Sequence, residues 1–343
     1  MKVAMYYHNH DVRLEEIPRP EIGPGEMLIK VMASGICGSD VMEWYRRQRA
    51  PLVLGHEMCG EIVEIGSRVS GFHPGQRVFV SHHVPCNTCR FCLRGHHTAC
   101  VTLHRTNFDP GGFSEYVRVP ELNVDRGVYL LPDEVSFEEG TFIEPLACVL
   151  RGQRLAGLEA GDAVLVIGAG ISGLLHIQLA RALGAGRIAA TDIQEYRLQA
   201  ARRFGADEVI TAGEDLAQKF RELNEGHLAD LVIICAGVEA VIQPALQAVD
   251  NGGTLLFFAV PQPGVKVPFP IPELWRREIT IRTSYGAAPQ DLMTALELIK
   301  SRRLPHLLEM VTHQLSLDEA GLGFRLVADA QESMKVIIKP FPS

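Results

Sequence analysis

The segment from residue 163 to 183 constrains the fold more than any other part of the chain. It begins with an apolar run, Ala163–Ile167, continues through a Gly-x-Gly-x-x-Gly turn at 168–173, and ends in a helix-like run that reaches Leu183. This order predicts a buried strand, a tight glycine turn and a helix. Because one such unit cannot bury its apolar strand alone, it must belong to a larger sheet.

The flanking sequence supplies that sheet. Strand-like runs alternate with helix-like runs at 187–191 (strand), 195–204 (helix), 208–210 (strand), 231–236 (strand), 240–249 (helix) and 254–259 (strand). Alternation of this kind predicts βαβ units and a doubly wound parallel sheet of the α/β class. We expect this domain to span residues 148–282.

The glycine turn also predicts a dinucleotide site. Glycines let the backbone approach a pyrophosphate closely, and the following helix offers free N–H groups and a favourable dipole. Asp192 ends the next strand, 19 residues after Gly173, where a carboxylate accepts ribose hydroxyls and repels a 2′-phosphate, which favours NAD over NADP. Arg197 is expected to contact the ribose or the surface. The predicted cofactor residues are Gly168, Gly170, Ile171, Ser172, Gly173, Asp192, Arg197, Ala236 and Val260.

The first 147 residues have a different sequence pattern. Short β-type runs at 27–32, 60–65, 77–80 and 115–119 are separated by Gly and Pro. This pattern predicts an irregular β domain. Beyond residue 283 we expect a helix at 292–301 and a strand-like tail at 333–340.

Four cysteines lie within fifteen positions of this first domain, at Cys86, Cys89, Cys92 and Cys100. Four thiolates from one compact lobe are typical of a closed, structural zinc site. The bacterial iron–sulfur run ends in C-x3-C-P, whereas here the last gap is seven residues and Val101 follows. We therefore predict zinc at these four residues.

A second set of potential ligands is dispersed over Cys37, His56, Glu57 and Glu144. A thiolate, an imidazole and a carboxylate with a water molecule make a catalytic zinc site with an exchangeable position. Taken singly, each residue has an ordinary alternative, because a lone Cys is usually a small core residue and a lone His a structural one. The remaining cysteines, at 59, 148 and 235, are expected to be packing residues.

Composition narrows the possible partners. The 343 residues carry a net charge of −8, which argues against nucleic-acid or anionic-membrane binding, since both need a basic face. The N-terminus has no signal-peptide pattern and no apolar run reaches the roughly 18 residues of a membrane span. A cytoplasmic location is therefore expected.

Together these motifs resemble the zinc-dependent medium-chain dehydrogenase/reductase family. The resemblance covers nearly the whole chain and rests on the zinc signature Gly55-His56-Glu57-x2-Gly60-x5-Gly66-x2-Val69, the four-cysteine lobe and the glycine turn. The segment Glu144-Pro145-Leu146-Ala147 looks like that of the sorbitol (polyol) and threonine dehydrogenase branch.

The resemblance implies a GroES-like catalytic domain at 1–147 with a zinc lobe at about 82–102, a Rossmann domain at 148–282, and a return to the catalytic domain at 283–343. It implies two zinc ions per chain, one structural and one catalytic, with Glu144 bound directly or through water. It also implies NAD as cofactor, a small-molecule alcohol as substrate and a homotetramer or dimer. Ser39 would pass the hydroxyl proton of the substrate outward.

The chain departs from the family pattern beside this site. Many relatives have a histidine five residues after the zinc cysteine, where this chain has Met42, which cannot carry a proton. Glu43 follows where an aromatic residue is common, and Gly286 falls about where sorbitol-type enzymes carry arginine. If Glu43 faced the pocket, it would hint at a hydroxylated or cationic substrate.

The leading prediction is thus oxidation of a secondary alcohol (a polyol, sugar or cyclitol) to a ketone. Alternatives are a threonine, amino-alcohol or butanediol dehydrogenase, a zinc-free reductase of the same architecture, and a non-enzymatic role.

Overall fold

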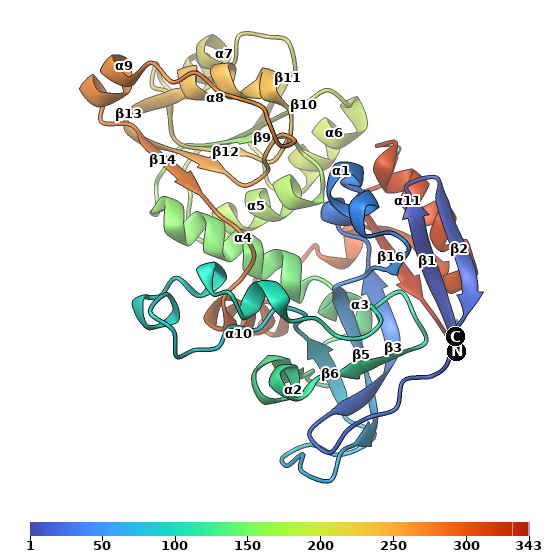
Figure 1. The fold of residues 1–343 in the computed structure, drawn as a ribbon. Coiled ribbons are helices and arrows are strands. Elements are labelled where there is room, and N and C mark those ends of the chain that lie inside the picture. Colours follow the sequence, from blue (N-terminus) through green and yellow to red (C-terminus); the bar gives the residue numbers. More distant parts are fainter. Residues whose placement is uncertain (331, 342–343) are drawn as a thin grey trace. The chain divides into compact units, whose positions relative to one another are not determined.

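The computed structural model describes residues 1–330 and 332–341 and divides into two compact units (Figure 1). The first contains Met1–Ala147 and Ala287–Ser343, and the second contains Cys148–Gly286. The units thus break after 147 and after 286, whereas we expected breaks after 147 and 282. Helix α4 (Ile143–Ala156) runs across the first break.

The second unit is built on a six-stranded parallel sheet. Its strand order is β11 (Glu208–Thr211), β10 (Ile188–Asp192), β9 (Val164–Ile167), β12 (Ala229–Ile234), β13 (Val249–Phe257) and β14 (Thr280–Thr283). All five pairings are parallel. The predicted doubly wound α/β sheet is confirmed. Its order reverses between β9 and β12, and ligands of such folds bind outside the carboxyl ends of the strands at this switch point.

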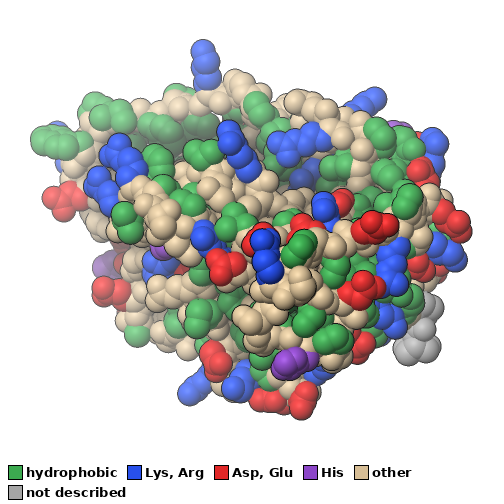
Figure 2. Space-filling model, turned by 60° about the horizontal axis from the view of Figure 1, so that its bottom comes forward, with side chains coloured by type: hydrophobic (Ala, Val, Ile, Leu, Met, Phe, Trp, Pro, Cys, Tyr) green, Lys and Arg blue, Asp and Glu red, His purple; other side chains and the backbone are tan. Residues whose placement is uncertain are grey.

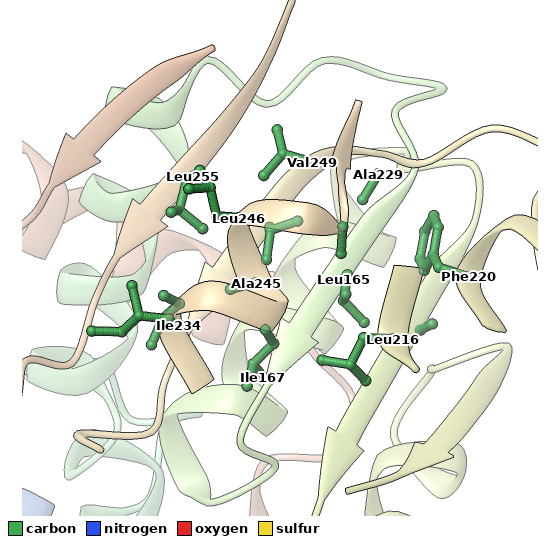
Figure 3. Close-up of a cluster of buried hydrophobic side chains, with 14 of the residues drawn as sticks. Leu165, Ile167, Leu216, Phe220, Ala229, Ile234, Ala245, Leu246, Val249 and Leu255 are labelled. Carbon is green, nitrogen blue, oxygen red and sulfur yellow. The ribbon is translucent and has the colours of Figure 1, made fainter. Parts of the chain in front are cut away.

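Helices cover both faces of that sheet. They are α5 (Ile171–Ala182), α6 (Glu195–Arg203), α7 (Leu216–Leu223), α8 (Ile242–Gln247) and α9 (Ile271–Arg276). One face carries an apolar cluster in which Leu216 and Phe220 of α7 and Leu246 of α8 pack on strand residues such as Leu165 and Ile234 (Figure 3). Strand β9 and residues 231–234 of β12 are apolar without alternation because both of their faces are covered.

The first unit holds two sheets, one of seven strands and one of three. The larger runs β15 (Val311–Ser316), β16 (Lys335–Lys339), β3 (Met27–Gly35), β5 (Glu57–Ile65), β6 (Arg77–Val80) and β8 (Val128–Leu130), and β7 (Tyr116–Val119) also pairs with β3. The smaller contains β2 (Asp11–Glu16), β1 (Lys2–His8) and β4 (Leu52–Val53). Strand β16 pairs antiparallel with β3 through Ile337 and Gly35, so the carboxyl-terminal segment returns to the N-terminal sheet.

Short helices complete this unit: α1 (Glu43–Arg46), α2 (Glu121–Gly127), α3 (Phe137–Gly140), α10 (Pro289–Lys300) and α11 (Ala320–Ala328). Helix α10 begins three residues before the apolar periodicity that predicted it. Pro289 occupies its first turn, and Asp291 accepts from the Ala288 N–H at 2.9 Å. Both are favourable at a helix start, where backbone N–H groups have no helical partner.

Acidic, basic and apolar side chains are interspersed over the face shown in Figure 2. Among the described helices, none is long and apolar enough to cross a membrane.

Candidate metal centres and nucleotide loop

The four-cysteine lobe follows β6 and closes on itself through two short 3-10 turns, Cys92–Arg94 and His97–Ala99. The Sγ atoms lie 3.5 Å (Cys89 to Cys92), 3.6 Å (Cys100 to Cys86) and 4.0 Å (Cys86 to Cys92) apart. A tetrahedron with zinc–sulfur bonds of about 2.3 Å has edges of about 3.8 Å. The thiol positions therefore fit a zinc ion bound by four sulfurs.

The lobe favours a thiolate at Cys86, whereas burial raises the pKa of Cys92 to about 12. The backbone N–H groups of Cys86 and Cys89 point at the sulfurs of Cys100 and Cys86, at 3.4 and 3.2 Å. Hydrogen bonds from the backbone and hydroxyl of Thr88 lower the pKa of Cys86 to about 5. Four ligands from the chain leave no position for a substrate, as expected for a structural site.

The second group brings together Cys37, His56 and Glu57, whose ligand atoms all lie within 4.8 Å of one another. Cys37 comes two residues after β3 and Glu57 begins β5. The two strands are neighbours, with Gly35 paired to Glu57. Adjacent strand ends thus gather residues twenty positions apart in the sequence.

Glu144, the fourth predicted ligand, is not part of that group. It lies in the first turn of α4 and is 9% exposed. Cys59, Cys148 and Cys235 belong to neither group of potential ligands found among the described residues. Cys59 is buried, and burial raises the pKa of its thiol.

Asp40 orients the imidazole of this site. Its carboxylate is fully buried, lies 3.3 Å from His56 Nδ1, and accepts from the Cys37 N–H at 3.1 Å. With Nδ1 engaged, Nε2 is the nitrogen available to a metal, as in many carboxylate–histidine–metal arrangements. Asp40 was not among the predicted site residues, although it lies only three residues after Cys37.

The charges around His56 favour a cation. Burial alone would lower the pKa of His56, but the Asp40 carboxylate and the Cys37 sulfur outweigh it and raise this pKa well above its ordinary value. The environment thus stabilises positive charge at this point. Three donors of zinc-binding type in such surroundings fit a zinc ion with an open fourth position.

Glu57 also forms a buried ion pair that the sequence did not indicate. Its carboxylate accepts a hydrogen bond from Lys335 Nζ of β16, and both side chains are almost completely buried. The pair meets over Gly35, where any side chain would overlap both groups.

Two further groups surround the site. The ring of His82, two residues after β6, lies 4.8 Å from the His56 ring and 3.9 Å from the His83 ring. Glu43 accepts from the Asn9 N–H at 3.4 Å. One oxygen of its carboxylate therefore contacts the turn between β1 and β2, and a role of Glu43 toward substrate stays a prediction.

Ser39 is half-buried, and Arg46 of α1 donates to it twice. The guanidinium Nε reaches the Ser39 carbonyl oxygen at 2.9 Å, and Nη2 reaches Oγ at 3.1 Å. Arg46 was not among the predicted site residues. It lies four positions after Met42, and nothing in the sequence pattern indicated its contact with Ser39.

The predicted nucleotide loop joins β9 to α5, as the motif requires. Gly168 has a left-handed backbone (φ 96°), and a side chain at Gly173 would collide with the Gly168 carbonyl oxygen. Gly170 is the N-cap of α5, so Ile171 and Ser172 present the first free N–H groups of a twelve-residue helix. This cradle fits a pyrophosphate.

The other predicted cofactor residues gather around the same loop. A side chain at Gly168 would touch Ala236, and one at Gly237 would touch the Val260 carbonyl oxygen. All of these follow the carboxyl ends of neighbouring parallel strands.

Asp192, predicted to contact the ribose, also makes hydrogen bonds within the protein. Its two oxygens accept from the N–H groups of Ala169 and Gln194 at 2.8 and 3.0 Å, and Arg197 Nη1 lies 3.8 Å away. The carboxylate is 7% exposed. It therefore ties the loop to β10, and each oxygen keeps one lone pair for a ligand.

Two family models match the chain: the alcohol dehydrogenase GroES-like domain at residues 23–133 and the zinc-binding dehydrogenase model at residues 172–301. Sorbitol dehydrogenase from Gallus gallus is 33% identical, over 97% of this chain and 94% of that relative. Sorbitol dehydrogenase from Bacillus subtilis (strain 168) is 32% identical, over 99% and 97%.

Solved structures agree over the whole length. The NADP-bound structure of a protein assigned as a zinc-binding dehydrogenase from Sinorhizobium meliloti 1021 matches with a TM-score of 0.87 and 30% identity, covering 99% of each chain. Galactitol-1-phosphate dehydrogenase from Escherichia coli matches with a TM-score of 0.86 and 31% identity, covering 99% of this chain and 100% of that one.

Proposed function

The chain belongs to the zinc-dependent medium-chain dehydrogenase/reductase family, in its polyol dehydrogenase branch, and from this premise we propose that it oxidises a secondary alcohol of a polyol, sugar or cyclitol to a ketone with NAD. The observation that carries the proposal is the gathering of Cys37, His56 and Glu57 around one point, with His56 oriented by Asp40. Three protein donors leave one position open to a substrate oxygen.

When bound, zinc supplies a Lewis acid for the alcohol oxygen, and NAD supplies the acceptor for a hydride from the alcohol carbon, which leaves a ketone and one proton. In this proposal Cys37, His56 and Glu57 hold the catalytic metal, and Glu144 assists directly or through water. Ser39, two residues from Cys37, contacts the reacting oxygen. Cys86, Cys89, Cys92 and Cys100 hold a second, structural zinc.

The preference for NAD rests on Asp192. A buried carboxylate at the end of β10, held by two backbone N–H groups, would repel a 2′-phosphate. A relative of similar architecture binds NADP, so cofactor choice needs its own measurement.

We also propose a homo-oligomer, with a tetramer as the expected form. Strand β14 is the edge of the six-stranded sheet, and all four of its residues are exposed. Nearby in the chain, Ile271 and Trp275 of α9 are 65% and 77% exposed. An open strand edge with apolar neighbours is a surface that proteins usually cover. Light scattering on the purified protein measures the oligomeric state directly.

The expected location of the protein remains the cytoplasm.

The test of function is a screen for NAD and NADP reduction with sorbitol, xylitol, inositols, 2,3-butanediol and threonine, together with zinc analysis. We expect activity on polyols with NAD and two zinc ions per chain. Turnover of threonine alone would favour the amino-alcohol alternative, which Met42 argues against. A protein that binds zinc only at the four-cysteine lobe and oxidises no alcohol would contradict the proposal.

A further inference from the structure

Arg46 contacts three residues beside the proposed catalytic centre. Besides its two hydrogen bonds to Ser39, its Nη2 atom lies 3.4 Å from Oδ1 of the fully buried Asp40. The guanidinium also stacks over the ring of Tyr45, with 4.7 Å between Cζ and the ring centroid. The side chain is only 14% exposed. These contacts fix its orientation.

The direction of the Arg46–Ser39 hydrogen bond has a consequence for the serine. A guanidinium carries five N–H donors and no acceptor, whereas a hydroxyl has one O–H donor and two acceptor lone pairs. Ser39 Oγ must therefore accept from Arg46, and its own hydrogen is left to point elsewhere. Ser39 cannot pass a proton to Arg46, and Met42, at the place where relatives carry a histidine, cannot take one either.

We propose that Arg46 is a positioning residue that fixes the Ser39 hydroxyl as a hydrogen-bond donor to the substrate oxygen. This inference rests on the proposed function. It replaces the expectation that Ser39 passes the substrate proton outward; that proton goes to water instead. A donor aimed at the oxygen contributes most where negative charge develops on it, because charge-assisted hydrogen bonds are about twice as strong as neutral ones.

The inference predicts an effect on turnover rather than on binding. Removing one donor of this kind typically lowers kcat by about 10²–10³-fold. Ser39→Ala should show a loss of this size. Arg46→Met should show a loss of about 10–100-fold, because the hydroxyl remains but loses its orientation. Arg46→Lys keeps a single donor and should recover part of the loss.

The test measures kcat and KM for sorbitol oxidation with NAD in both single variants and in the Ser39→Ala/Arg46→Met double variant. If Arg46 acts through Ser39, the double variant is no slower than Ser39→Ala alone. Two readouts other than turnover accompany it: zinc content per chain and the dissociation constant of sorbitol for protein saturated with NADH. Both should stay within about threefold of wild type. Arg49→Met is the matched control, because Arg49 stacks on the same Tyr45 ring at 5.5 Å and, among the described residues, makes no hydrogen bond to Ser39.

Losses that multiply in the double variant would overturn the inference and assign the effect of Arg46 to Asp40 and His56. Loss of zinc from both Arg46→Met and Arg46→Lys would likewise show a merely structural role. Wild-type protein that oxidises polyols while Arg46→Met is unimpaired overturns this inference and leaves the proposed function intact. Wild-type protein that oxidises no alcohol overturns both.

Discussion

Lys335, in the last strand of the chain, donates to the carboxylate of Glu57 across 278 positions of sequence. Three neighbouring strands create this contact: β16 pairs with β3 at Ile337 and Gly35, and β3 pairs with β5 at Gly35 and Glu57. The ammonium also lies 5.5 Å from the centroid of the Phe142 ring. The return of the chain to its first unit therefore supplies a charge partner to a proposed metal ligand.

Replacing Lys335 with Met should destabilise the first unit strongly. Breaking a buried pair by removing one partner costs about 3–5 kcal/mol, because the other charge remains buried without compensation. Urea unfolding of the zinc-loaded protein measures this loss. The control is Lys339→Met, which breaks the Lys339–Glu138 pair at 2.7 Å between side chains that are 23% and 20% exposed. It should cost about 1 kcal/mol or less. Equal losses of unfolding free energy in the two variants would mean that the buried Lys335–Glu57 pair stabilises the protein no more than the exposed pair does.

Gly35→Ala tests the same contact from the backbone side. A Cβ at this position would overlap the Glu57 carboxylate and the Lys335 ammonium, so the pair must separate or β3 must shift. We expect a loss of about 1–3 kcal/mol, as is usual for overpacking, together with weaker zinc retention at the Cys37 site. Gly38→Ala is the matched control, since a Cβ there meets no atom within 4 Å. A Gly35→Ala protein as stable as Gly38→Ala would contradict the geometry.

The two metal sites should respond differently to loss of one thiol. Cys92→Ser removes a buried ligand of the four-cysteine lobe, where metal binding energy is folding energy, so one zinc and several kcal/mol of stability should be lost. Cys37→Ser should also lose one zinc and nearly all turnover, but with a smaller change in Tm. Zinc analysis and thermal unfolding of both variants check this. An equal fall in Tm would refute the division into a structural and a catalytic site.

Asp192→Asn should weaken the discrimination against NADP. The substitution removes the negative charge but keeps one oxygen to accept from the Ala169 or Gln194 N–H, so the loop retains part of its support. Like charges that face each other cost on the order of a few kcal/mol, so the ratio of kcat/KM for NAD over NADP should fall at least about tenfold. Arg197→Gln serves as comparison, since its ion pair with Asp192 spans 3.8 Å. An unchanged ratio in Asp192→Asn would mean that this carboxylate supports the loop alone.

The sequence predicted the features that depend on local spacing. The parallel sheet and the glycine turn follow from short-range periodicity, and the four cysteines lie close together in the chain, so their zinc-like arrangement follows from spacing too. Lys335 and Gly35 could not be found this way, because their roles exist only once β16 has paired with β3. Arg46 is close to Ser39 in the sequence, but nothing in the sequence pattern indicated that its side chain would donate a hydrogen bond to Ser39.

Helix boundaries were least predictable where polar residues supply the capping. The apolar periodicity of 292–301 does not contain Pro289 and Asp291, which set the true start of α10. The helix expected at 240–249 is shorter in the structure, where it spans Ile242–Gln247. There β13 begins early, at Val249, which pairs with Ala229 ahead of an irregularity in the register.

A buried imidazole in the second unit should make its stability depend on pH. His176 of α5 is fully buried, and burial lowers its pKa to about 3. Its Nδ1 atom lies 3.2 Å from Gln153 Nε2. In the unfolded chain this histidine has an ordinary pKa of about 6.5. Below that pH the unfolded state binds a proton on it, whereas the folded state does not. Stability from this group is thus complete above pH 6.5 and is lost as pH falls toward 3, at about 1.4 kcal/mol per pH unit.

Between pH 7 and 5, His176 should therefore remove about 2 kcal/mol of stability from the wild type, and His176→Met should lack this loss. Hydrogen exchange of β9 and β12 amides at the two pH values, compared at matched intrinsic rates, follows the unfolding of this sheet. His227→Met is the control in the same unit, because that side chain is 78% exposed and should leave the wild-type slope unchanged. If His176→Met loses as much stability as the wild type over this range, the buried imidazole accepts its proton without unfolding the sheet, and the assignment of the acid-sensitive group is wrong.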